Sequence, residues 1–167
     1  MLMTRKFARA SAHTFTIKPI KELLSRYILS PKGWADPFSG FNSPAEYTND
    51  MNTARPTQYH LEALEFANIL PHGLEGALFD PPYSYRQVSE HYKILGKKAT
   101  ALDTSYNFYA RVLDPLSKKI KQGGIAISFG WNSNGFGKKR GFEIIEIMNV
   151  AHGLHHNDTI VTVEVKI

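Results

Sequence analysis

The stretch Gly76-Ala77-Leu78-Phe79-Asp80-Pro81-Pro82-Tyr83 combines a short apolar strand with an abrupt stop. Small and apolar residues fill its first half, and the two adjacent prolines that follow cannot continue a central strand. In doubly wound α/β folds, ligands bind where parallel strands end, at the carboxyl edge of the sheet. The stretch therefore predicts a rigid turn at a ligand-binding edge.

Helical and strand-like patterns alternate on either side of this stretch, which is typical of an α/β domain with a mostly parallel sheet. Apolar residues at helical spacing predict helices over residues 20–29, 56–70 and 102–120, the last kinked or restarted at Pro115. Short apolar or β-branched runs predict strands over residues 33–38, 45–48, 76–79 and 125–131. Residues 143–150 and 159–167 predict an antiparallel hairpin at one edge of the sheet, and residues 84–100 predict a loop carrying a helical piece.

The 167 residues fit one domain of ordinary size. We therefore expect a single domain over residues 1–167, with a flexible basic arm over residues 1–13 and no separate target-recognition domain. The 20 Lys and Arg against 15 Asp and Glu give a net charge of +5, which favours an anionic partner such as nucleic acid.

The chain contains no cysteine, which excludes a disulfide scaffold, a Cys-based zinc site and a thiol nucleophile. This composition fits a reducing compartment, and we expect a cytoplasmic protein. No apolar run approaches the roughly 20 residues that a membrane span needs. We therefore expect no contact with a membrane.

The residues of the rigid turn suggest a specific chemistry. The carboxylate of Asp80 and the backbone carbonyl of Pro81 would project as two fixed acceptors, Pro82 would make the turn rigid, and the Tyr83 ring would offer a flat face. Such a site suits a planar aromatic amine, because the ring stacks while both amino hydrogens are held. Holding both hydrogens favours a pyramidal nitrogen whose lone pair points at an electrophile. These four residues are the candidate catalytic residues.

With this Asp-Pro-Pro-Tyr motif the chain resembles the S-adenosylmethionine-dependent adenine-specific (N6) DNA methyltransferases, especially the small phage and prophage type. Their signature is Asp, Asn or Ser followed by Pro-Pro and an aromatic residue, and the Asp-Pro-Pro-Tyr form is typical of methylation at the exocyclic N6 of adenine. The resemblance extends from Thr14 to Lys166. It implies a Rossmann-like methyltransferase fold, S-adenosylmethionine as methyl donor, DNA as substrate, and a target base flipped out of the duplex onto Tyr83.

The resemblance also implies which residues bind the donor. Asp36-Pro37-Phe38-Ser39-Gly40 resembles the family's donor loop, Asp50 resembles the acidic residue that holds the ribose hydroxyls, and Lys18-Pro19 resembles part of an N-terminal donor-binding motif. Here residues 40–44 lead almost directly into the second strand, where the family has a second glycine and a helix. Either a bare loop makes this connection or the predicted second strand is misplaced.

Two basic segments are candidates for contact with a nucleic-acid backbone. One is the loop after Tyr83, with Lys97 and Lys98, and the other contains Lys138, Lys139 and Arg140. Glycines around the second segment are reminiscent of a phosphate loop, but the Gly-Lys-Ser/Thr ending is missing. We expect it to be a basic, flexible loop near the active edge.

Other conspicuous residues have simpler interpretations. Trp34 and Trp131 lie on predicted strands, where packing is expected of them. A turn with His152, His155, His156 and Asp158 is expected to be a polar hairpin turn, because adjacent His residues do not both point inward as metal ligands must. The methyl transfer requires no metal.

Two alternatives to DNA methylation stay open. Methylation of RNA or of a protein glutamine amide would use the same acceptors, and the missing second glycine favours a noncatalytic nucleic-acid-binding module with a degenerate donor pocket. Without a recognition domain, sequence specificity must come from residues 84–100 and 132–141 or from a partner, either a second copy of the chain or another protein.

Overall fold

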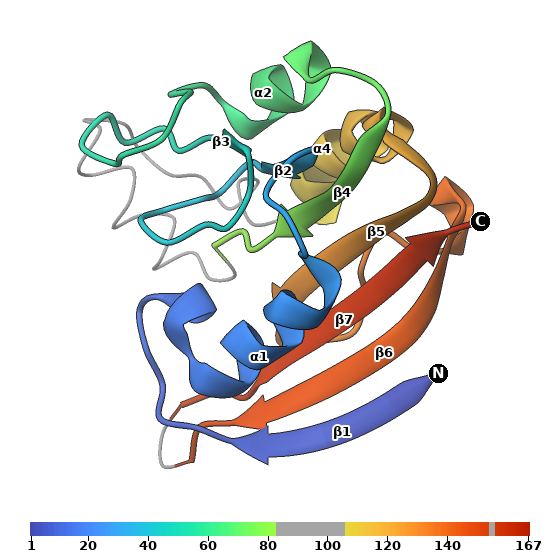
Figure 1. Cartoon of the computed structure of the whole chain (residues 1–167). Helices are drawn as coiled ribbons and strands as arrows, with labels where there is room; N and C mark the ends of the chain where they lie inside the picture. The colour runs from blue at the N-terminus through green and yellow to red at the C-terminus, as the bar shows by residue number, and fades with distance from the viewer. Residues whose placement is uncertain (83–105, 154–155) are drawn as a thin grey trace.

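The computed structural model describes residues 1–82, 106–153 and 156–167, and these form one mixed sheet with helices on both faces (Figure 1). The strands are β1 (Leu2–Phe7), β2 (Trp34–Asp36), β3 (Tyr47–Thr48), β4 (Leu74–Phe79), β5 (Ile120–Gly130), β6 (Phe142–Ala151) and β7 (Thr159–Lys166). The helices are α1 (Lys18–Tyr27), α2 (Ala63–Ile69) and α4 (Tyr106–Lys119), with short 3-10 helices η1 (Thr14–Thr16) and η3 (Lys138–Arg140). The predicted loop over residues 84–100 lies outside the described residues, as do Tyr83, Lys97, Lys98 and His155.

The sheet has seven strands in the order β1-β6-β7-β5-β4-β2-β3. Strands β3, β2, β4 and β5 are parallel neighbours, whereas β7 runs antiparallel to both β5 and β6. The predicted α/β class, with a mostly parallel sheet and a C-terminal antiparallel pair, is therefore confirmed. The predicted edge position of that pair is wrong, because β1 adds to the outer side of β6 in parallel.

Strand β1 takes the place of most of the predicted flexible arm. Its residues pair with β6 from Leu2 opposite Glu146 to Phe7 opposite Ala151, and the Ala8 amide donates to the Ala151 carbonyl at 3.1 Å. Phe7 is 74% exposed, as expected of an edge strand that is not covered on that face. The arm prediction failed because such a strand lacks the apolar alternation that marks a half-buried one.

Two hydrophobic clusters fill the two faces of the sheet. One lies under α2 and α4 and includes Phe66 and Leu116, and the other lies under α1 and includes Ile20 and Trp34. The packing role expected of Trp34 is confirmed, since its ring lies so close to Gly76 that a Cβ there would approach it to 2.7 Å. Trp131 differs from the prediction, because β5 ends at Gly130 and the Trp131 side chain is 48% exposed.

The predicted helix over residues 56–70 exists only in its second half, as α2. The first half pairs with β3 instead, because the Tyr59 amide donates to the Thr48 carbonyl at 3.0 Å and the Asp50 amide donates to the Tyr59 carbonyl at 3.2 Å. Helix α4 runs through Pro115 without ending there. Its last residue, Lys119, donates from Nζ to the carbonyls of Asn68 and Leu70, which fastens the end of α2.

Candidate functional site

Three aspartates stand at the ends of three neighbouring parallel strands. Asp36 is the last residue of β2, Asp50 follows β3, and Asp80 comes directly after β4. Burial raises the pKa of the Asp36 carboxyl, the nearby charges of Asp80 and Asp50 add to the rise, and hydrogen bonds from Ser43 and Phe38 oppose it; the resulting pKa is about 7. The sheet therefore brings the three predicted site carboxyls together at its carboxyl edge.

The loop between β2 and β3 is held by hydrogen bonds rather than by a helix. The Asp36 side chain is fully buried, and it accepts from the Ser43 hydroxyl at 2.6 Å and from the Phe38 amide at 2.9 Å. The Ser39 hydroxyl donates to the Asp36 carbonyl at 2.8 Å. Gly40 supplies the positive φ of 56° that the turn requires. Of the two possibilities raised by the sequence, the structure therefore has the bare loop, and the second strand lies at Tyr47–Thr48 within its predicted range.

Asn49 ties this loop to the next segment, a role that the sequence did not reveal. Its Nδ2 donates to the carbonyls of Pro37 at 3.1 Å and Leu61 at 3.0 Å, and its Oδ1 accepts from the Leu61 amide at 2.9 Å. Because the side chain is buried, each of these bonds fixes the backbone around the loop between β2 and β3. An asparagine after a short strand predicts only a turn, so no signal in the sequence marked this connection.

The Asp80-Pro81-Pro82 turn is fixed from helix α4. The Tyr109 hydroxyl donates to the Pro82 carbonyl, and burial raises the Tyr109 pKa to about 12. Pro81 is buried, whereas Asp80 is half-buried. The pattern over residues 102–120 predicts only a helix, and helical spacing does not reveal that the Tyr109 hydroxyl holds this turn. Pro81 stays the predicted second acceptor, and Tyr83 lies outside the described residues.

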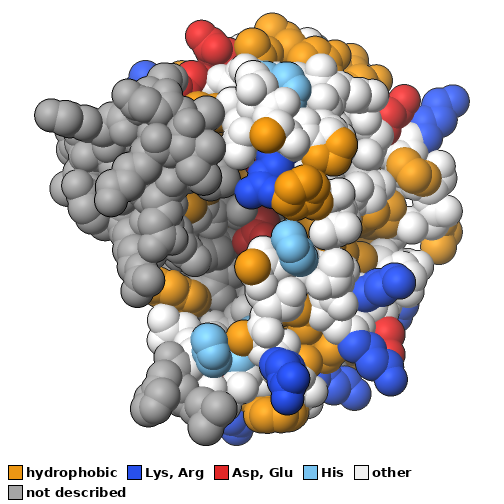
Figure 2. Space-filling view, turned by 90° about the vertical axis from the view of Figure 1, so that its left-hand side faces the viewer, with side chains coloured by type: hydrophobic (Ala, Val, Ile, Leu, Met, Phe, Trp, Pro, Cys, Tyr) orange, Lys and Arg blue, Asp and Glu red, His pale blue; other side chains and the backbone are white. Residues whose placement is uncertain are grey.

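The segment before α1 lies beside the loop between β2 and β3. The His13 ring is 5.8 Å from the Phe41 ring, edge to face, and Lys18 and Pro19 begin the helix that follows. Lys18 is exposed and Pro19 is buried. Figure 2 looks onto this side of the molecule and shows, near the centre of the view, an acidic patch set deeper than the basic, His and hydrophobic side chains around it.

The basic segment Lys138–Arg140 lies at the opposite end of the strands from the candidate site. It forms η3 just before β6, whose first residue Phe142 pairs with Lys166 at the end of β7. The end of β7 pairs with β5 near Ile125, in the first half of β5. The candidate site instead follows the end of β4, which pairs with the last part of β5. The expected position near the active edge is therefore wrong.

Glu164 explains the glycines around this basic segment. Its carboxylate is buried and accepts from the amides of Phe136 at 2.6 Å and Gly137 at 2.8 Å. The loop thus wraps an internal carboxylate instead of a phosphate.

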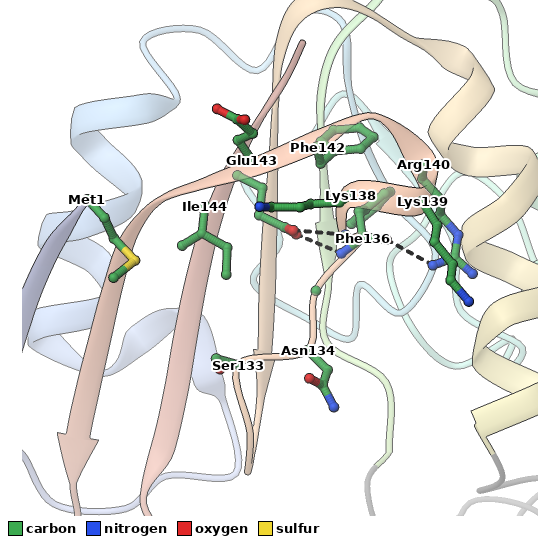
Figure 3. A pocket seen from close by; sticks show the side chains of 13 residues that line it. Met1, Ser133, Asn134, Phe136, Lys138, Lys139, Arg140, Phe142, Glu143 and Ile144 are labelled. Carbon is green, nitrogen blue, oxygen red and sulfur yellow. Dashed lines mark hydrogen bonds between the residues drawn. The ribbon is translucent and has the colours of Figure 1, made fainter.

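The basic side chains of this segment face other groups. Arg140 pairs with Asp114 at 2.7 Å. A pocket of about 730 Å³ lies beside this loop, with Lys138 and Lys139 in its lining (Figure 3).

In the described part of the histidine turn, His152 has a structural role. His152 is buried, with Nδ1 2.9 Å from the Ala8 carbonyl and Nε2 2.8 Å from the Thr159 hydroxyl. Within residues 1–82, 106–153 and 156–167, no group of three His, Asp or Glu side chains is placed to hold a metal ion. None of the described helices has the length and apolarity to cross a membrane.

No family model matches the chain, and no curated protein matches it. Solved structures do match it. TrmN from Thermus thermophilus is 16% identical with a TM-score of 0.58 over 91% of this chain and 49% of TrmN. A Streptococcus mutans protein described as a methyltransferase, in complex with S-adenosylhomocysteine, is 11% identical with a TM-score of 0.54 over 87% of this chain and 97% of that one. The chain has a Rossmann-like methyltransferase fold.

A third solved structure extends the same comparison. A Clostridium thermocellum protein described as an rRNA methylase is 6% identical with a TM-score of 0.55 over 95% of this chain and 98% of that one. The chain spans about half the length of TrmN. At these identities the methyltransferase fold is what the similarity establishes.

Proposed function

We propose that the protein transfers a methyl group from S-adenosylmethionine to the exocyclic N6 amine of adenine in DNA. The observation that carries the proposal is that Asp80-Pro81-Pro82 continues β4 at the same sheet edge where Asp36 and Asp50 end their own strands. An amine-binding turn and a cluster of carboxyls thus meet at the place where this class of fold binds its ligands.

The residues present fit the methyl donor. Several carboxyls at one edge favour a cationic ligand, and S-adenosylmethionine carries positive charge on its sulfur and its amine. Asp50 would hold the ribose hydroxyls, while Lys18, Pro19 and the loop of Pro37, Phe38 and Gly40 would surround the rest. Asp36 contributes by shaping that loop, because both of its carboxylate oxygens accept hydrogen bonds within it. When bound, the donor supplies an electrophilic methyl group.

Asp80 and Pro81 would act on the acceptor amine. The carboxylate and the carbonyl accept its two hydrogens, which concentrates the nitrogen lone pair toward the electrophile without a strong base. Asp80 is also the group at this turn that can take the proton that the methylated nitrogen loses. Tyr109 supports the turn through the Pro82 carbonyl, so the acceptors keep their orientation. Tyr83 stays the predicted stacking platform.

RNA is the second candidate substrate. The net charge of +5 suits either nucleic acid, and one structural neighbour is described as an rRNA methylase. The two acceptors do not distinguish adenine in DNA from adenine in RNA, nor either from a glutamine amide. The predicted backbone contacts of Lys97 and Lys98 suit both nucleic acids equally.

A labelling experiment tests the proposal. The protein is incubated with radiolabelled S-adenosylmethionine and, in separate reactions, unmethylated duplex DNA, RNA or protein, with the Asp80→Ala variant as control. We expect label in N6-methyladenine of DNA from the unmutated protein alone. Label in RNA or in glutamine would identify a different substrate but would agree with the proposed chemistry of the Asp80 site. If no substrate is labelled and calorimetry detects no donor binding, the result would favour a noncatalytic nucleic-acid-binding module.

A further inference from the structure

Phe41 and Arg55 form a stacked pair at the rim of the candidate site. The Arg55 guanidinium carbon lies 4.0 Å from the centroid of the Phe41 ring, and that ring is 51% exposed. Phe41 belongs to the loop that follows β2, and Arg55 belongs to the segment that follows β3. Both segments leave the carboxyl edge of the sheet, so the pair lies on the same side of the molecule as Asp36 and Asp50.

The turn that carries Arg55 is anchored to Asp50. The Asp50 Oδ1 atom accepts from the Asn52 amide at 2.8 Å, and the Asn52 side chain accepts in turn from the Ala54 amide at 3.0 Å. The Arg55 amide then donates to the Asn52 carbonyl at 2.9 Å. The backbone at Arg55 is therefore held by a turn that starts at the same aspartate that we assign to the donor.

The chemistry of the pair suits an anionic ligand. The ion pairs among the described residues engage Arg26, Lys121 and Arg140 but not Arg55, and the buried Arg55 Nε has no hydrogen-bond partner in the described part of the chain. A guanidinium held over the face of an aromatic ring can present N–H groups as a rigid fork that matches a phosphate. The cation also offsets the strand-end carboxyls, which would otherwise repel a polyanion.

We propose that Arg55 binds a backbone phosphate of the nucleic-acid substrate next to the target base, and that Phe41 holds the guanidinium in the binding orientation. The inference rests on the proposed function for the identity of the substrate. It assigns substrate contact to the loops after β2 and β3, in addition to the contacts that the sequence predicts for Lys97 and Lys98. The donor and the substrate would then be held by two ends of one turn, Asp50 and Arg55.

The test measures binding directly, so that it does not depend on catalysis. Fluorescence anisotropy of a short adenine-containing duplex and of its single strand is recorded over a series of salt concentrations. For Arg55→Gln we expect about tenfold weaker binding at low salt, and a slope of log K against log salt that is lower by about 0.9 for the duplex or 0.7 for the single strand. Arg55→Lys should retain the slope but lose part of the affinity, because it keeps the charge without the fork.

Three further measurements frame this result. Phe41→Leu should weaken binding without changing the slope, and the affinity for S-adenosylmethionine should stay unchanged in both Arg55→Gln and Phe41→Leu. Arg111→Gln removes the same charge from an exposed position on α4 and should leave nucleic-acid binding unchanged. An equal loss in Arg55→Gln and Arg111→Gln would overturn the inference, as would wild-type affinity and slope in Arg55→Gln.

The outcomes separate this inference from the proposed function. If the unmutated protein binds nucleic acid in an Arg55-dependent way but transfers no methyl group, the proposed function fails and the inference stands. If it methylates DNA while Arg55→Gln binds normally, the function stands and the inference fails. An unmutated protein that binds neither duplex nor single strand would overturn the inference together with the nucleic-acid substrate.

Discussion

The Ser43 hydroxyl donates a hydrogen bond to Oδ2 of Asp36 at 2.6 Å, inside the loop that connects β2 and β3. Together with the Phe38 amide, which donates to Oδ1, this bond lets a single buried carboxyl support the connection between β2 and β3 in place of a crossover helix. A short loop is sufficient because its polar groups are satisfied from within.

The raised pKa of Asp36 predicts how stability depends on pH. The carboxyl has a pKa of about 7 in the folded protein against an ordinary value of 3.8, so between these values the folded state keeps a proton that the unfolded state has released. Ionisation therefore favours unfolding, and the contribution of Asp36 to stability falls as pH rises from about 4 to about 7, by at most tenfold in the unfolding constant per pH unit. Urea unfolding over this range measures the effect.

The matched control for this prediction is Asp36→Asn. Asparagine keeps an oxygen for the Phe38 amide and offers its own amide to the Ser43 hydroxyl, yet it does not titrate. The difference in unfolding free energy between the two proteins should grow in favour of the variant as pH rises. A difference that is constant from pH 4 to pH 8 would contradict a raised pKa at Asp36.

Asp80→Ala should abolish methyl transfer and leave the fold intact. Loss of one fixed acceptor in a preorganised site costs about 10²–10³ in rate, and Asp80→Asn should be milder if its side-chain oxygen still accepts. Glu75→Ala is the control, because Glu75 is an exposed acid on the same strand whose ion-pair partner, Lys121, is also exposed. Turnover of Asp80→Ala at the rate of the Glu75 variant would refute the assigned mechanism.

Asp50→Ala should weaken S-adenosylmethionine binding by about 1 to 3 kcal/mol, the usual value for a hydrogen bond to a charged group. Asp50→Asn separates ligand contact from turn support, because it keeps an oxygen for the Asn52 amide. Titration calorimetry measures the S-adenosylmethionine affinity of both variants. Glu65→Ala, which removes an exposed acid on α2, is the control. Wild-type affinity in Asp50→Ala would place the donor elsewhere.

Tyr109→Phe should slow methyl transfer by up to about tenfold and lower the unfolding free energy by about 1 kcal/mol, because one hydrogen bond to the Pro82 carbonyl is lost. Donor affinity should not change. Tyr27→Phe also loses a hydroxyl hydrogen bond, the one to the Glu146 carboxylate at 2.7 Å, on the other face of the sheet. It should reduce stability without slowing transfer, and equal kinetics in the two variants would argue against a positioning role for Tyr109.

The sequence predicted best where local pattern and tertiary position agree. A buried strand followed by two prolines can end in few ways, so the β4 end and its Asp80 turn were predictable from residues 76–83 alone. The α/β class followed from the same logic, because alternating apolar runs and helical stripes leave few arrangements. The second strand was also found at Tyr47–Thr48 despite its two-residue length.

The misplaced elements are those whose structure depends on a distant partner. Strand β1 exists because β6 offers an edge, and nothing in residues 1–13 encodes that edge. Residues 56–60 have helical spacing, yet the Tyr59 backbone pairs with Thr48. Lys138–Arg140 follow glycines that suggest an anion-binding loop. The anion that this loop encloses is Glu164, which lies 27 to 29 residues further along the chain than Gly135, Phe136 and Gly137, so a local motif cannot reveal it.

The Glu164 cradle gives the last prediction. A Cβ at Gly135 would lie 2.0 Å from Glu164 Oε2, and this carboxylate is pinned by the amides of Phe136 and Gly137, so Gly135→Ala should lower the unfolding free energy by about 1 to 3 kcal/mol. Glu164→Ala should also destabilise, because two buried amides lose their acceptor. The double variant should be less destabilised than the sum of the two, since removing the carboxylate removes the clash with the added methyl group. Strictly additive unfolding free energies from urea titration would show that the loop and Glu164 do not contact each other as described.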